Sequence, residues 1–152
     1  MTHFNKFIVT ILFLLSLYYT SETSALIGSY NVGSGQTYTT LTGAGGFFDA
    51  VNTQGLTGNV TVLITSNIVE AGSISLNQWA TAGFTITISP NSATVRTIGG
   101  NLANALFILN GADNLTIDGR FGGSGRYLRF YNTNNGGTTF RFINDATNNT
   151  IT

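Results

Sequence analysis

Residues 106–118 read LFILNGADNLTID, and residues 140–152 read FRFINDATNNTIT. Laid on each other without a gap, the two segments agree at five of 13 positions, at a spacing of 34 residues. A weaker pair sets TVLI at 61–64 against TITI at 85–88, at a spacing of 24. Similar strand-turn-strand units at irregular spacing are typical of solenoid coils that carry loops of different length. The repeats therefore predict an all-β solenoid.

The rest of the chain after Gly58 favours the same fold. Short runs in which apolar and polar residues alternate are separated by Gly, Asn and Asp, as in β-strands joined by turns. These runs occupy 59–65, 84–89, 93–98, 105–109, 115–118, 127–131 and 139–143. In a parallel solenoid we expect Ile86, Ile108 and Ile117 to stack inward. An antiparallel β-sandwich with hairpins between the runs is the alternative.

Residues 47–54 show a helical pattern instead. Phe47, Ala50 and Val51 are spaced three and four apart, so they share one face of a helix, and Gly55 is placed to end it. A helix of two turns is marginal alone and needs a tertiary surface to lie on. We expect it to cover the first coil of the solenoid.

Residues 1–25 have the pattern of a secretory signal peptide. Lys6 precedes an apolar segment at 7–19, and Thr23-Ser24-Ala25 offers small residues for cleavage. Thirteen helical residues span only about 20 Å, less than the roughly 30 Å core of a bilayer. The sequence therefore predicts a secreted or cell-surface protein with no membrane span after cleavage.

Three segments follow from these patterns. They are the signal peptide at 1–25, an amino-terminal strand and capping helix at 26–57, and the first coils of a β-helix at 58–152. The last residues, 149–152, correspond by the repeat to the first half of a strand. A solenoid needs a cap over its last coil. We therefore expect the β-helix to be truncated at this end and the chain to continue into further domains.

Composition excludes several classes of protein. Only 8% of the 152 residues are charged, the formal net charge is zero, and there is no Cys. Without a basic excess, electrostatic binding to nucleic acid is not expected. Without Cys, disulfides and thiolate metal sites are excluded. Gly, Asn, Thr and Ser make up 71 residues, and these are the residue types that solenoid strands and turns use.

The chain after Ala25 offers little reactive chemistry. It has no His, Cys or Lys, which excludes a Ser/His/Asp triad, a His-ligated metal and a Schiff-base lysine. Asp118 precedes Gly119 and is interpreted as a turn residue, as is Asp145. The sequence thus predicts no catalytic residue, no cofactor and no metal site. The acids that remain are Asp49, Glu70, Asp113, Asp118 and Asp145.

One stretch could contact a ligand. Arg126, Tyr127, Arg129 and Tyr131 interleave cations and aromatic rings, which could form a ledge for a sugar. The alternative is that Tyr127, Arg129 and Tyr131 are the outward residues of an ordinary strand, with Leu128 pointing inward.

Three motifs resemble a known family. GSGQTYTTL at 33–41, GFFDAVN at 46–52 and LNGADNLTIDGR at 109–120 are similar to the opening segment of large secreted right-handed parallel β-helix proteins. These are pectin-lyase-like proteins of bacterial cell surfaces, many of them exported by the type IX route. The resemblance implies a Gly-rich strand and a short helix that cap the β-helix.

The expected function follows from the leader, the hydroxyl-rich strands and the lack of reactive side chains. It is that of a non-catalytic surface scaffold or adhesin that binds carbohydrate or another cell-surface polymer. The alternative is the amino-terminal part of a polysaccharide-degrading β-helix enzyme whose active residues lie beyond Thr152.

Overall fold

The computed structural model describes residues 24–80 and 83–152, so the signal peptide predicted at 1–25 lies almost wholly outside the described residues. Eleven strands form three sheets. Sheet A contains β1 (Leu26–Val32), β2 (Leu56–Ile64), β5 (Ile86–Pro90), β8 (Leu115–Ile117) and β11 (Thr150–Ile151). Sheet B contains β3 (Ile68–Val69), β6 (Arg96–Gly100) and β9 (Leu128–Asn132). Sheet C contains β4 (Leu76–Asn77), β7 (Phe107–Asn110) and β10 (Phe140–Ile143).

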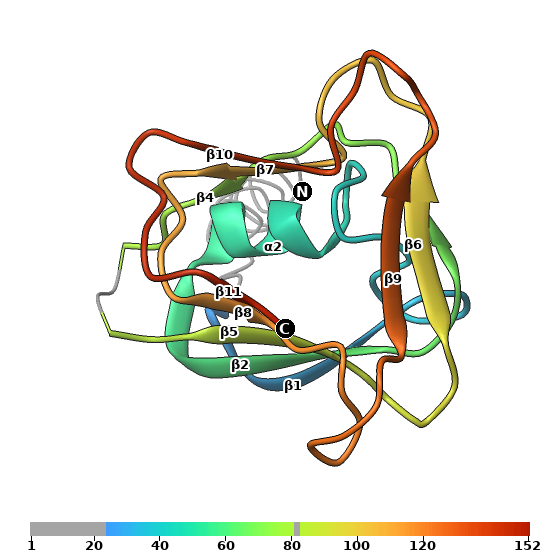
Figure 1. Ribbon diagram of the computed structural model, residues 1–152. Helices are drawn as coiled ribbons and strands as arrows, with labels where there is room; N and C mark the ends of the chain where they lie inside the picture. Colours follow the sequence, from blue (N-terminus) through green and yellow to red (C-terminus); the bar gives the residue numbers. More distant parts are fainter. Residues whose placement is uncertain (1–23, 81–82) are drawn as a thin grey trace, which may run out of the picture.

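The chain visits the sheets in the order A, B, C and then returns to A one level higher. Figure 1 shows this right-handed path along the rod, with sheet A at the bottom, B at the right and C at the top. Every pairing between named strands is parallel. The fold is therefore a parallel β-helix of about four turns, as the repeats predicted, and the sandwich alternative is excluded.

The core is built from inward side chains that stack on one another in register. In sheet A, Val62, Ile88 and Ile117 form one such stack, and all three are buried. The prediction that Ile108 points inward and joins such a stack was wrong. Ile108 is only half-buried on β7, because Phe107 and Leu109 are the inward residues of that strand.

The spacing of the repeats needs correction. Val62 pairs with Ile88, a spacing of 26 residues rather than 24. In sheet C, Phe140 pairs with Phe107 at a spacing of 33, whereas Thr150 pairs with Thr116 at the expected 34. One extra residue lies in the turn between them, at the end of β10, where Asn144 and Asp145 have positive φ of 52° and 62°. Thr and Ile alternate along these strands, so a slip of two residues looks the same in the sequence.

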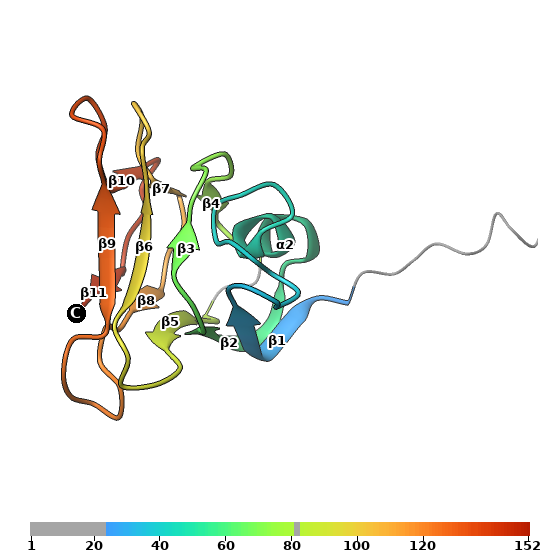
Figure 2. The same cartoon turned by 90° about the vertical axis from the view of Figure 1, so that its right-hand side faces the viewer.

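The predicted helix is confirmed as α2 (Phe47–Gln54). Phe47, Phe48, Ala50 and Val51 are buried. Gly55 has a positive φ of 70°, and its N–H donates to the Val51 carbonyl, which ends the helix. Figure 2 shows α2 closing one end of the rod, while the carboxyl terminus lies at the other end.

A buried carboxylate ties the loop before α2 to the first coil. Glu70 is only 3% exposed. Its Oε1 accepts a hydrogen bond from the backbone N–H of Leu41 (2.7 Å), and its Oε2 accepts from the N–H (2.8 Å) and the hydroxyl (2.6 Å) of Thr42. Because no other group in the described part of the chain offers these buried N–H donors an acceptor, Glu70 acts as an anchor of the cap.

Candidate functional site

The outer face of sheet B holds the exposed aromatic and cationic side chains of β9. Ile98 and Phe130 pair in register and point inward, so their neighbours point outward. One outward row consists of Val69, Gly99 and Tyr131, paired across β3, β6 and β9. We call this row, together with Thr97 and Arg129 beside it, the sheet B face.

Gly99 allows the ring of Tyr131 to lie on the sheet. A Cβ at position 99 would overlap the ring carbons of Tyr131, so the ring covers the glycine. The guanidinium carbon of Arg129 lies 5.8 Å from the centre of the same ring, which is a cation–π distance. On the other side of Gly99, Val69 is 81% exposed. Val69 and the Tyr131 ring therefore form an exposed apolar surface, and the guanidinium of Arg129 borders it.

The four residues singled out in the sequence are only partly brought together. Arg129 and Tyr131 share the outer surface of β9, and Tyr131 remains 36% exposed. Tyr127 precedes β9, is half-buried, and its ring lies on Gly125. Arg126 is exposed in the turn before it. Leu128 packs toward the core, as the alternating pattern indicated.

Two contributors to the face were missed in the sequence. Val69 lies in a strand of two residues, too short to show alternation, and Gly99 sits at the end of a run predicted to stop at 98. The Gly99-Gly100 pair was the one available signal, since Gly in a strand often marks close approach of another group.

Arg120 forms an ion pair with Asp118. Its Nε lies 2.8 Å from Oδ1 of Asp118, and its second guanidinium nitrogen lies 2.9 Å from Oδ2. The backbone N–H of Arg120 also donates to Oδ1 (2.9 Å), which closes the predicted turn. The side-chain and then the backbone hydrogen bonds from Arg120 lower the pKa of Asp118 to about 2. The same contact raises the pKa of Arg120.

The remaining acids also have structural partners or lie in turns. Asp49 accepts from the N–H of Gly45 (2.9 Å), and Asp113 accepts from the N–H (2.6 Å) and hydroxyl (2.8 Å) of Thr147 in the next coil. Asp145 is an exposed turn residue. Within residues 24–80 and 83–152, no three His, Cys, Asp or Glu side chains are grouped so that they could hold a metal.

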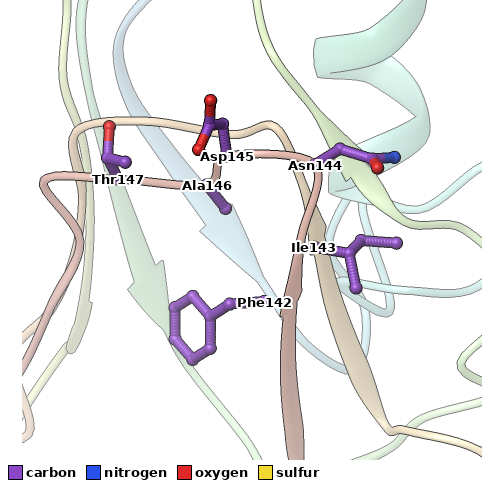
Figure 3. Close-up of a pocket in the computed structure, with 6 residues that line it drawn as sticks. All are labelled: Phe142, Ile143, Asn144, Asp145, Ala146 and Thr147. Atoms are coloured by element: carbon purple, nitrogen blue, oxygen red, sulfur yellow. The ribbon is translucent and has the colours of Figure 1, made fainter.

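Two hollows are lined by residues that do not belong to the sheet B face. One, of about 250 Å³, is lined by residues 142–147 at the end of the rod that α2 does not cover. Figure 3 shows Phe142 and Ala146 on its inner side, with Ile143 pointing the other way. The other, of about 230 Å³, is lined by Ala103, Asn104, Ala105, Gly136, Thr138 and Arg141. Neither brings two acids together.

No helix among the described residues is both long and apolar enough to cross a membrane. No family model, no curated protein and no solved structure matches the chain.

Proposed function

We propose that the chain is a non-catalytic scaffold segment of an exported surface protein, and that its sheet B face binds carbohydrate. The observation that carries this proposal is the ring of Tyr131, which lies on Gly99 between the exposed Val69 and the cation of Arg129. The resemblance to secreted, pectin-lyase-like surface proteins supports the same assignment.

The chemistry of the sheet B face suits a sugar ring. A pyranose has one face of C–H groups and a rim of hydroxyls. Its C–H face can pack on an exposed aromatic ring, and its hydroxyls can accept hydrogen bonds from a guanidinium. Arg129 is available for this role, because the one ion pair among the described residues joins Arg120 to Asp118. Thr97, which pairs with Arg129 across the strands, adds a hydroxyl to the same rim.

The outer face of sheet A differs in chemistry from the sheet B face. The outer side of sheet A carries a row of hydroxyls formed by Ser29, Thr61, Thr87, Thr116 and Thr150, paired in register along five strands. It has no exposed aromatic ring in this row. Compared with the outer face of sheet A, the sheet B face therefore offers the better stacking surface for a sugar.

A binding experiment tests the assignment. The chain is titrated with a panel of neutral and acidic polysaccharides. For a polysaccharide that binds, Tyr131→Ala and Arg129→Gln are each expected to weaken affinity by about tenfold. Phe121→Ala and Arg141→Gln are matched controls, because Phe121 is exposed in a loop and Arg141 points outward from sheet C.

Three results would contradict the proposal. The first is that no polysaccharide of the panel binds, and the second is that the controls weaken binding as much as the sheet B variants do. The third is depolymerisation of a bound polysaccharide by the chain itself, which would favour the enzyme alternative.

Export is tested separately. If residues 1–25 are a signal peptide, the protein recovered from the cell surface or medium begins at Leu26. A protein that keeps residues 1–25 and stays inside the cell would refute export. The sugar-binding assignment would then depend only on the polysaccharide titrations.

A further inference from the structure

A second apolar surface lies at the amino-terminal end of β9, whereas Tyr131 lies near the other end of that strand. Arg96 pairs in register with Leu128, and its N–H donates to the carbonyl of Tyr127 (2.7 Å). The residue before Arg96 therefore lies beside Tyr127 on the neighbouring coil. This residue is Val95, which is 55% exposed. We call Val95 and Tyr127 the Tyr127 surface.

The ring of Tyr127 covers a glycine, as the ring of Tyr131 does. A Cβ at Gly125 would overlap the ring of Tyr127, and a Cβ at Gly99 would overlap the ring of Tyr131. Leu128 packs toward the core, and side chains alternate along a strand, so Tyr127 points to the same outer side as Tyr131. Both rings therefore belong to the outer side of sheet B.

A polar row separates the two apolar surfaces. Thr97 pairs with Arg129, and Oδ1 of Asn67 accepts a hydrogen bond from the N–H of Thr97 (2.9 Å), so the three residues follow one another on successive coils. Tyr127 and Tyr131 lie on either side of Arg129 in the chain. At about 3.3 Å per residue, these two tyrosines are about 13 Å apart along the strand. The outer side of sheet B thus has hydrogen-bonding groups in its middle and an apolar surface on each side of them.

The position of both rings on one strand fixes the direction of a polymer that touches both. Figure 2 shows β3, β6 and β9 side by side, each running across the rod. A polymer parallel to the rod axis would cross Val69, Gly99 and Tyr131, and it would meet one aromatic ring. A polymer parallel to β9 would meet Tyr131, Arg129 and Tyr127 in turn. The second path therefore gains a further stacking contact.

The separation of the two rings also restricts the shape of the ligand. Because both rings face the same side of one strand, the ligand must be extended and present apolar faces to a single plane. A β-1,4-linked chain of glucose is an extended ribbon, and each of its rings has C–H groups on both sides. An α-1,4-linked chain of the same sugar curls, since each linkage turns the chain. The ribbon reaches both tyrosines, whereas the curled chain leaves one of them.

We propose that the outer side of sheet B binds an extended β-1,4-linked glycan that runs along β9, across the rod. This inference rests on the proposed sugar-binding function and adds to it a substrate class and a second stacking ring. One sugar ring packs on Tyr131 and another on Tyr127, while Arg129 donates hydrogen bonds to hydroxyls of the sugars between them. Because the two stacking contacts are linked through one ligand, a long chain binds more tightly than a short one.

Cellohexaose and maltohexaose are the probes, because they contain the same sugar and differ only in linkage. Cellohexaose is expected to bind at least about tenfold more tightly than maltohexaose, and also more tightly than cellobiose, which is too short to reach both rings. Tyr127→Ala is expected to weaken cellohexaose binding about fivefold. The same variant should change cellobiose binding by less than about twofold, since Val69 and Tyr131 are intact. Tyr127→Phe keeps the ring and should bind both sugars as the native chain does.

A second variant makes the test independent of whether Tyr127→Ala folds. Val95→Asp places a charge beside Tyr127 at an exposed position and is expected to weaken cellohexaose binding in the same way. Phe121→Ala is the matched control, because Phe121 is an exposed ring in the turn before β9 and belongs to neither apolar surface. It should leave the affinity for cellohexaose unchanged.

The outcomes separate this inference from the proposed function. Equal affinity for the two hexaoses, or unchanged cellohexaose binding in Tyr127→Ala and Val95→Asp, would overturn the inference. If Tyr131→Ala alone weakens binding, sugar binding at the sheet B face stands and only the path along β9 is refuted. The same holds if cellohexaose does not bind while another polysaccharide binds through Tyr131. Sugar binding that Tyr131→Ala does not weaken would refute the proposed function as well.

Discussion

Replacing Glu70 tests how the cap is held on the rod. The carboxylate accepts three hydrogen bonds, from the N–H of Leu41 and from the N–H and hydroxyl of Thr42, at 2.6–2.8 Å. In Glu70→Gln the single carbonyl oxygen can replace only one carboxylate oxygen. The least disruptive arrangement puts it at the place of Oε2, which leaves the NH₂ group of the new side chain facing the N–H of Leu41.

The expected cost follows from that lost bond. A buried donor left without an acceptor costs about 1–3 kcal/mol, so Glu70→Gln is expected to lower the free energy of unfolding by about 2 kcal/mol. Glu70→Ala leaves both backbone donors unpaired, and we expect about twice that loss. A domain is commonly stable by about 5–15 kcal/mol, so the larger loss would be easily measured.

Urea unfolding of the chain gives the free energies, and hydrogen exchange locates the effect. The amides of Leu41 and Thr42 should exchange faster in both variants. Asp145→Asn is the control, because Asp145 is an exposed turn residue. If Glu70→Ala costs less than about 0.5 kcal/mol, in the range of ordinary surface substitutions, the carboxylate does not anchor the cap.

Three further predictions concern single positions. Gly99→Ala should cost about 1–2 kcal/mol in urea unfolding, because its Cβ overlaps the Tyr131 ring, and the cost should fall when Tyr131→Ala is also present. Asp118 has a lowered pKa, so its contact with Arg120 is expected to stabilise the fold above pH 3.8 and to lose that effect as pH falls through about 2. Urea midpoints should therefore show Asp118→Asn slightly less stable than the native chain at pH 6 and equal to it below pH 2, because the exposed contact is screened by solvent. Asn110→Ala removes two side-chain hydrogen bonds, one donated to Asn77 Oδ1 and one accepted from Asn144 Nδ2, and should lower the unfolding free energy by about 1–2 kcal/mol. No loss in urea unfolding would mean that these amide contacts between coils do not stabilise the fold.

The fold could be predicted from the sequence because the helical pattern, the alternation along the strands and the turn residues were all consistent with one solenoid. Phe47, Ala50 and Val51 share a helical face that ends at Gly55, and the structure has the helix at that place. The longer strands show clear alternation between inward and outward residues. β3 and β4, of two residues each, are too short for alternation to be visible and were missed.

Register was harder to predict than strand position. A parallel pairing depends on the length of the whole coil, so loops elsewhere decide which residues stack. This is why Ile108 was expected to point inward and is instead half-buried, and why two repeat spacings were off by one and two residues.

In the candidate site, too, the sequence predicted neighbours along one strand but not neighbours from other coils. Alternation along one strand was enough to place Arg129 and Tyr131 on one surface, and the structure has them there. Gly99 and Val69 come from other coils, and only the register brings them beside Tyr131.

Sugar binding at the sheet B face is best tested by locating the contacts between sugar and protein. With a bound oligosaccharide, nuclear Overhauser effects between sugar C–H protons and the protein report which side chains touch the ring. If the sugar binds at the sheet B face, contacts are expected to the ring protons of Tyr131 and to the methyl groups of Val69. Contacts confined to the threonine methyl groups of sheet A, or none at all to the sheet B face, would contradict it.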